Sequence, residues 1–367
     1  MKHKYRSLII GTIVIFLAMN AIPTNVLGKT RQYYLTTFIY QNEIQGEGFT
    51  NSIGSDDSIS FEATTYALDI LNYFAVNPHD IETLKSTLED DIEEMFNNYE
   101  ENLFDLFFLM KSLNILDQNH EIDLDLENKI YKFLNDTEQL TGGFSYSNTS
   151  NLVSLASTYY SIQLFSLIEK PIENNAIHKN WVLSCYNSDG GYGSNQSLMS
   201  TLVDTCFAVF ILKELGEIEA LNSDIKTIAY LHSFFVMNSA DLNNYGGYLP
   251  DEYAQIALLS STYYCVKAID LIDNTKMFKG TIKTWVLAHQ NFIDGGFAEN
   301  TEGYQQKSSS VVSSYYAFEI LKILGYLSSF LSEIWMVEFN YWILGIVLGS
   351  IGLVIVVAVF LWRRTRI

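Results

Sequence analysis

Few residues of this 367-residue chain have types and spacings that could do chemistry. Its three cysteines, Cys185, Cys206 and Cys265, follow no disulfide-framework spacing, and an odd number leaves at least one thiol free. We expect all three to pack as small apolar residues. The sequence contains no P-loop, GxGxxG, HExxH or GxSxG motif. An acidic run at 89–101 predicts a solvated helix face rather than a divalent-ion site.

Internal repeats are the elements that must position any such side chain. Four segments, about 50 residues apart, open with Gly-Gly-aromatic and continue to Ser/Asp-Thr/Ser-X-aromatic and an apolar run. A looser copy begins at Glu47, and the segment 102–116 has the apolar pattern without the glycines. About six units are therefore expected between residues 40 and 330. The predicted turn glycines are Gly142, Gly143, Gly190, Gly191, Gly246, Gly247, Gly295 and Gly296.

Each unit predicts two helices of different character. The upstream segments, such as 175–187 and 280–291, have apolar residues at helical spacing, and Gly-Gly ends them because glycine tolerates positive φ. Ser157 and Asp204, at the start of the following runs, suit helix N-caps. Those runs are apolar nearly all round, which is typical of a helix buried on several sides. No repeat has the pattern of a cap, so two concentric layers closed into a ring are expected rather than an open stack.

This pattern resembles the repeat of prenyltransferase β-subunits and squalene-type terpenoid cyclases, over about four-fifths of the chain. The resemblance implies an all-α fold, an α6/α6 toroid of about six helical-hairpin repeats. It also implies that inner helices surround a ligand funnel lined by aromatics. The alternative is that the same rings only fill a core. The expected lining is Tyr66, Tyr159, Tyr160, Phe207, Tyr263, Tyr264, Tyr315 and Tyr316.

The same resemblance implies a metal site in part only. Asp204 and Cys206 match the Asp-X-Cys that holds zinc in protein prenyltransferases, where a histidine completes a catalytic site. Ser261 stands where the family has that histidine, and Leu198 and Thr201 stand where it has diphosphate-binding cations. We therefore expect no cofactor, with Asp204 as a cap and Cys206 in the core. The alternative is a zinc site.

The two ends of the chain predict membrane targeting. A basic start and a short apolar run at 8–19 are typical of a secretory signal, the alternative being an uncleaved anchor. Residues 343–361 are uncharged and long enough to span a bilayer, and the arginines that follow favour the cytoplasmic side. The predicted parts are a signal segment (1–28), the toroid (35–330), a linker (331–340), a transmembrane helix (341–362) and a basic tail (363–367).

These expectations combine into one hypothesis. The formal net charge of −20 argues against nucleic acid as a partner. We expect a single-pass cell-membrane protein whose toroid lies outside the cytoplasm and binds, without catalysis, an apolar small molecule or a protein partner. The alternative is a divergent zinc-dependent prenyltransferase-like enzyme that uses Asp204 and Cys206. The predicted placement argues against it, because isoprenoid diphosphates are made in the cytoplasm.

Overall fold

The computed structural model describes residues 29–54, 58–98, 102–117 and 123–336. They fall into two compact units, of which the larger is Gln32–Leu331. In the smaller unit, strand β1 (Lys29–Thr30) pairs antiparallel with β8 (Ile334–Met336). No helix within these described ranges is long and apolar enough to cross a membrane. The predicted signal segment (1–28), transmembrane helix (341–362) and basic tail (363–367) lie outside the described residues.

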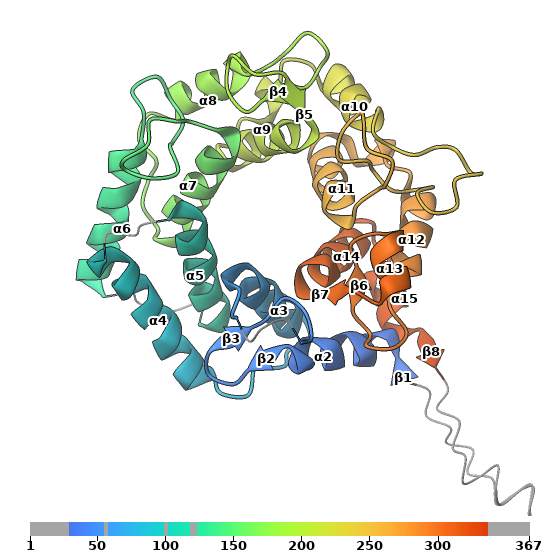
Figure 1. Ribbon diagram of the computed structural model, residues 1–367. Helices are drawn as coiled ribbons and strands as arrows, with labels where there is room; N and C mark the ends of the chain where they lie inside the picture. The colour runs from blue at the N-terminus through green and yellow to red at the C-terminus, as the bar shows by residue number, and fades with distance from the viewer. Residues whose placement is uncertain (1–28, 55–57, 99–101, 118–122, 337–367) are drawn as a thin grey trace, which may run out of the picture. The chain divides into compact units, whose positions relative to one another are not determined.

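The larger unit is a ring of two helical layers, as Figure 1 shows. Each inner helix packs on the next, and the last packs on the first, which confirms the predicted α/α toroid. In ring order the inner helices are α3 (Phe61–Tyr73), α5 (Leu103–Leu116), α7 (Leu155–Leu167), α9 (Leu202–Glu214), α11 (Leu259–Asp273) and α14 (Val311–Ile323). The outer helices are α2 (Arg31–Gln41), α4 (Ile81–Asn97), α6 (Leu124–Thr137), α8 (Asn175–Ser184), α10 (Asp224–His232) and α12 (Lys279–Ala288).

The difference between the layers follows from the residue pattern. On the inner helix α9 every residue at 205–212 is buried. The outer helix α4 buries only Leu84, Leu88 and Ile92, which form one stripe at four-residue spacing. The segment 102–116, expected as an inner helix although it lacks the glycine marker, is α5. A helix apolar on all sides is stable here because it has neighbours on both flanks and an outer helix behind it.

The Gly-Gly pairs let each repeat approach the next outer helix closely. Gly142 has φ 97°, and a Cβ on it would lie 2.8 Å from the carbonyl oxygen of Ile177 on α8. A side chain there would be strained in its own backbone and would collide with that helix. The last pair repeats the contact across the ends of the ring, because a Cβ on Gly295 would collide with the Tyr34 carbonyl of α2. The same kind of contact, a glycine against an outer helix, therefore joins neighbouring repeats and also joins the last repeat to the first.

Backbone hydrogen bonds also join neighbouring repeats, including the last repeat and the first. The first N–H of α7, from Leu155, donates to the Ser194 carbonyl in the next repeat at 3.0 Å. The first N–H of α14, from Val311, donates at 2.8 Å to the carbonyl of Asn51 in the first repeat. Two otherwise unpaired helix-terminal donors are thus satisfied, one of them across the closure.

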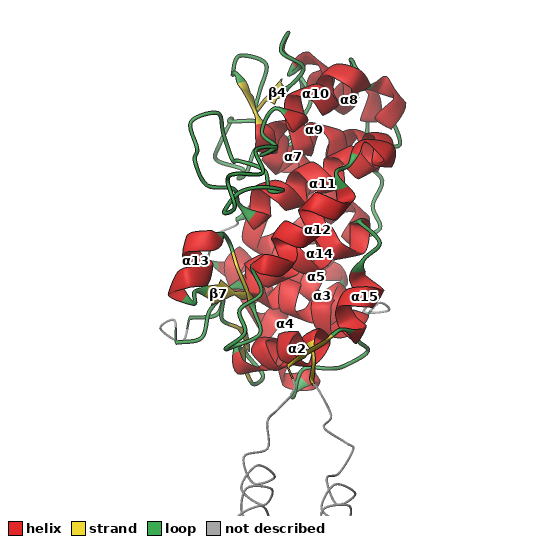
Figure 2. Cartoon of the chain, turned by 90° about the vertical axis from the view of Figure 1, so that its right-hand side faces the viewer, coloured by secondary structure: helices red, strands yellow, loops and turns green. Residues whose placement is uncertain are grey.

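Short strands, which the sequence did not predict, tie the loops that enter the inner helices. Figure 2 shows these loops on one side of the ring, here called the mouth face. The antiparallel pairs are β2 (Glu43–Ile44) with β3 (Gly48–Phe49), β4 (Tyr192–Gly193) with β5 (Ser200–Thr201), and β6 (Phe297–Ala298) with β7 (Ser309–Ser310). Two short helices, α13 (Thr301–Gln306) and α15 (Leu327–Ser332), and two 3-10 turns, Ile218–Ala220 and Asn274–Lys276, complete the described elements.

Candidate functional site

The most regular polar residue of the repeat has a structural task. Five repeats have a threonine or serine hydroxyl near the start of the inner helix, at the second position of Ser/Asp-Thr/Ser-X-aromatic. In the looser first copy the corresponding residue is Thr64. In each of these repeats the hydroxyl accepts a hydrogen bond from the backbone N–H of the aromatic residue after the glycines. The pairs are Phe49 to Thr64 at 2.9 Å, Phe144 to Thr158 at 3.0 Å, Tyr192 to Thr205 at 2.9 Å, Tyr248 to Thr262 at 3.0 Å and Phe297 to Ser314 at 2.9 Å. Each bond fixes a mouth loop to its own inner helix. Their shared period was visible in the sequence, but their contact was not.

Asp204 is the third residue of α9 and Ser157 is the third residue of α7, so the prediction of both as N-caps was wrong. Thr201 is the cap of α9 and accepts from the Asp204 N–H at 3.0 Å. In return the Thr201 hydroxyl donates to Asp204 Oδ2 at 2.7 Å, an exchange related to a capping box. Burial raises the pKa of the Asp204 carboxyl, and hydrogen bonds from Thr201 and Ser194 oppose this shift. The Asp204 carboxylate therefore already accepts a hydrogen bond at the N-terminus of its own helix.

Asp204 and Cys206 do not fit a zinc site. Cys206 is fully buried, and its thiol lies beside that of Cys265 on the neighbouring helix α11, where it adds to the rise that burial causes in the pKa of Cys265. The third position is the buried Ser261, whose hydroxyl is a poor substitute for an imidazole ligand. In the part of the chain that the structure describes, no three His, Cys, Asp or Glu side chains converge as metal ligands would.

Inside the ring, the sixth residue of every inner helix is aromatic, and we call these six residues the aromatic belt. Neighbouring rings of the belt contact one another around the full circle, with centroid separations of 5.8, 6.1, 5.9, 5.6, 6.1 and 5.8 Å in ring order, starting from the Tyr66–Phe108 pair. Such edge and tilted contacts are the arrangements that aromatic pairs prefer. The belt is Tyr66, Phe108, Tyr160, Phe207, Tyr264 and Tyr316.

The expected funnel aromatics all lie in or beside this belt. Tyr159, Tyr263 and Tyr315 each precede a belt residue and pack against the belt from the next layer. Tyr315 stacks on Tyr66 with a centroid distance of 3.9 Å. Phe108 was not among the predicted residues, because its repeat lacks the Gly-Gly pair that aligns the others. One belt hydroxyl has a polar partner, because Tyr316 Oη donates a hydrogen bond to Glu62 Oε1 at 3.4 Å. Burial raises the pKa of this Glu62 carboxyl.

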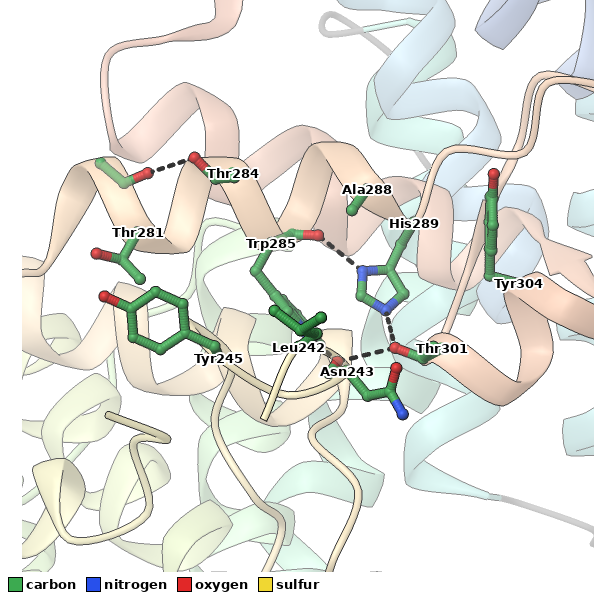
Figure 3. Close-up of a pocket in the computed structure, with 11 residues that line it drawn as sticks. Leu242, Asn243, Tyr245, Thr281, Thr284, Trp285, Ala288, His289, Thr301 and Tyr304 are labelled. Atoms are coloured by element: carbon green, nitrogen blue, oxygen red, sulfur yellow. Dashed lines mark hydrogen bonds between the residues drawn. The ribbon is translucent and has the colours of Figure 1, made fainter. Parts of the chain in front are cut away.

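A second candidate site is a groove on the outer layer, with a volume of about 610 Å3 (Figure 3). One side of α12 forms its floor, and the 242–245 loop and α13 form its walls. A groove of this size is in the range of small-molecule sites. None of its described lining residues carries a formal charge at neutral pH. They are Leu242, Asn243, Tyr245, Gly280, Thr281, Thr284, Trp285, Ala288, His289, Thr301 and Tyr304.

His289, the one titratable group of the groove with a shifted pKa, is held neutral. Its Nδ1 lies 2.7 Å from the Trp285 carbonyl and its Nε2 lies 3.2 Å from the Thr301 hydroxyl. Burial lowers the pKa of this histidine. No carboxylate, cysteine, serine or lysine lies among the groove residues just named, so His289 has no acidic partner there. The groove was not predicted, because three separate segments, 242–245, 280–289 and 301–304, form it.

Comparisons with known proteins give the following matches. A family model described as the prenyltransferase alpha-alpha toroid domain matches residues 76–179, 167–239 and 241–346. Candida albicans protein geranylgeranyltransferase-I complexed with GGPP is similar in structure, with a TM-score of 0.58 and 16% identity over 77% of this chain and 90% of that chain. A type II terpene cyclase from Scytonema in complex with merosterolic acid A has a TM-score of 0.48 and 10% identity, covering 82% and 97% of the two chains. No curated protein sequence matches the chain.

Proposed function

This chain belongs to the prenyltransferase alpha-alpha toroid domain family, and from that premise we propose that it is a non-catalytic binding protein for an apolar ligand. The observation that carries this proposal is the aromatic belt, to which all six inner helices contribute. Apolar and aromatic linings with a few polar tips are typical of small-molecule sites. We favour an apolar ligand over the protein partner that the sequence left open, because the belt lies inside the ring, where a folded protein has no room.

The zinc-dependent enzyme remains the less favoured hypothesis. Such an enzyme needs a metal with an open position and cations for a diphosphate. Here Cys206 is buried beside Cys265, the Asp204 carboxylate accepts from Thr201, and Ser261 takes the place of the histidine. We therefore assign no catalytic residue, and Asp204 and Cys206 are helix-end and core residues in this proposal.

The placement of the toroid is part of the same proposal. The uncharged stretch at 343–361 would anchor the chain, with the arginines after it in the cytoplasm and the ring outside. A protease added to intact cells tests this, since it should remove the ring and leave the C-terminal tail protected. Protection of the ring in intact cells would contradict the placement.

Extraction of the full chain, purified in detergent, tests the ligand. We expect about one apolar molecule per chain in the extract by mass spectrometry, and its loss when the belt is broken in Phe207→Ala. Tyr253→Ala is the matched control, because Tyr253 is 84% exposed on a mouth loop. Equal amounts in the two variants would contradict the belt as the site. A zinc-to-protein ratio near one that Cys206→Ala abolishes would instead favour the enzyme.

A further inference from the structure

A polar layer lies directly below the aromatic belt, on the side away from the mouth face. It consists of the ninth residue of each inner helix, three positions after the belt residue and so on the same helix side. At a rise of 1.5 Å per residue the two layers are about 4.5 Å apart along the helices. Four of its six members are charged. The polar layer is Asp69, Lys111, Gln163, Phe210, Lys267 and Glu319.

Contacts place Lys267 of this layer in the interior of the ring, and the charges that act on Lys111 place it near Lys267. The Nζ of Lys267 on α11 lies 4.7 Å from the centre of the Phe210 ring on α9 and 5.9 Å from that of Tyr159 on α7. Because α9 separates α11 from α7, this amine reaches inward rather than along its own helix. Lys111 lies on α5, opposite α11 in ring order, with its Nζ 5.9 Å from the Phe107 ring. Burial lowers the pKa of Lys111, the charges of Asp69 and Glu319 oppose this shift, and the charge of Lys267 reinforces it. Since the charge of Lys267 acts on the pKa of Lys111, the two amines lie within electrostatic reach of each other in the polar layer.

The carboxylates of the polar layer form no ion pair with its two lysines. Glu319 is in an ion pair with Lys322, at 2.8 Å. Among the described residues, neither Lys111 nor Lys267 has a carboxylate oxygen within 4.0 Å. Asp69 is the one other carboxylate of the layer, and it forms no ion pair with either lysine. Asp69 and Glu319 thus act on Lys111 only from beyond ion-pair distance, and the hydrogen bond of the Lys267 amine is to the neutral Tyr263 hydroxyl, at 3.4 Å. A partly buried charge without an ion pair is costly.

We propose that Lys111 and Lys267 bind the anionic head group, a carboxylate or a phosphate, of an amphiphile whose apolar part lies against the aromatic belt. This inference rests on the proposed function and specifies that the apolar ligand is an acid. A cationic ligand fits less well, although aromatic rings attract cations, because the Lys267 amine already lies over the Phe210 ring.

The test compares three probes of equal chain length on the full chain in lipid nanodiscs, with empty nanodiscs as the blank. Decanoate and decyl phosphate carry the head group, and decanol does not. We expect at least one acid to bind about tenfold tighter than decanol, as a charge-assisted hydrogen bond would give. The tighter of the two acids identifies the head group as carboxylate or phosphate.

Variants then assign the preference to the two lysines. Lys111→Met and Lys267→Met should each lower the affinity for the preferred acid to that of decanol while leaving decanol binding unchanged. Lys267→Arg should keep the preference, and so should Lys276→Met, whose lysine is exposed outside the inner layer. Unchanged far-ultraviolet circular dichroism excludes unfolding as the cause of a loss.

The outcomes separate this inference from the proposed function. If the acids and decanol bind the wild-type chain equally, or if both methionine variants keep the acid preference, the head-group site is wrong and the apolar site stands. If none of the three probes binds above the empty nanodiscs, the apolar-ligand function and this inference are both wrong.

Discussion

Replacing Thr262 with valine tests whether the repeated threonine is a structural tie between loop and helix. Its hydroxyl accepts from the Tyr248 N–H at 3.0 Å and donates to the Leu258 carbonyl at 2.7 Å, and the side chain is fully buried. Valine has the same shape without the hydroxyl. The Leu258 carbonyl keeps a partner, because the backbone N–H of Thr262 also donates to it at 3.0 Å. Thr262→Val therefore leaves one group, the Tyr248 N–H, buried without an acceptor.

The expected loss in the free energy of unfolding is about 1–3 kcal/mol, the cost of one unsatisfied buried donor. The matched control is Thr284→Val on the outer helix α12. Its exposed hydroxyl donates only to the Gly280 carbonyl of its own helix, so the expected change is within about 0.5 kcal/mol. Urea unfolding of the full chain, followed by far-ultraviolet circular dichroism, measures both changes.

Hydrogen exchange separates the lost bond from a general loss of stability. In Thr262→Val the Tyr248 amide should exchange faster than other amides of its loop, measured on a peptide that covers 245–250. Thr262→Ser should keep that protection, because Ser314 makes the same bond in a sibling repeat, at 2.9 Å. A valine variant as stable as the wild type, or with Tyr248 still protected, would refute the structural role of the hydroxyl.

Three further outcomes follow from the structure. Gly295→Ala should lower the free energy of unfolding by about 2 kcal/mol or more in urea, because the residue has φ 90° and a Cβ would meet the Tyr34 carbonyl; an unchanged midpoint would contradict this closure contact. Burial lowers the pKa values of His178, His232 and His289, so the unfolded chain binds more protons in acid. The urea midpoint should therefore fall as the pH drops below about 6.5, and a pH-independent midpoint between 8 and 5 would be inconsistent with three neutral histidines. Phe108→Leu keeps an apolar side chain but removes two ring contacts of the belt, so thermal unfolding should show a loss of about 1–3 kcal/mol, and no loss would mean that the belt contacts are incidental.

The ring itself could be predicted because its determinants are local and repeated. A glycine pair that must approach the next helix and an apolar run of helical period recur along the chain, and each copy corroborates the others. The copy without glycines, α5, was found by its apolar run and its distance from the neighbours. The short strands were not foreseen, since two-residue ladders such as β4 with β5 have no periodicity that a sequence pattern could show.

The interior of the ring could be predicted only in part, because adjacent aromatics gave two solutions. In Tyr159-Tyr160, Tyr263-Tyr264 and Tyr315-Tyr316 a rotation of about 100° about the helix axis decides which ring joins the belt. The structure places the second of each pair there. The polar layer follows only from that choice, since Lys267 lies three positions after Tyr264 and on the same helix side. If the rotation of each inner helix about its axis is not known, the sequence does not show that its charged residues lie on one level inside the ring.

The assignment of Asp204 shows why a family motif can mislead within a repeat protein. Five of the six inner helices begin with a side chain that accepts a hydrogen bond at the helix N-terminus, so residues suited to capping occur where a metal ligand could also stand. In α7 the third helical residue, Ser157, exchanges hydrogen bonds with the Ser154 cap, and Asp204 has the same relation to Thr201 in α9. An Asp at that position needs no metal to explain it. A ligand requires in addition that partners from neighbouring helices converge on it, and the neighbouring Ser261 and the inward-buried Cys206 provide no such convergence.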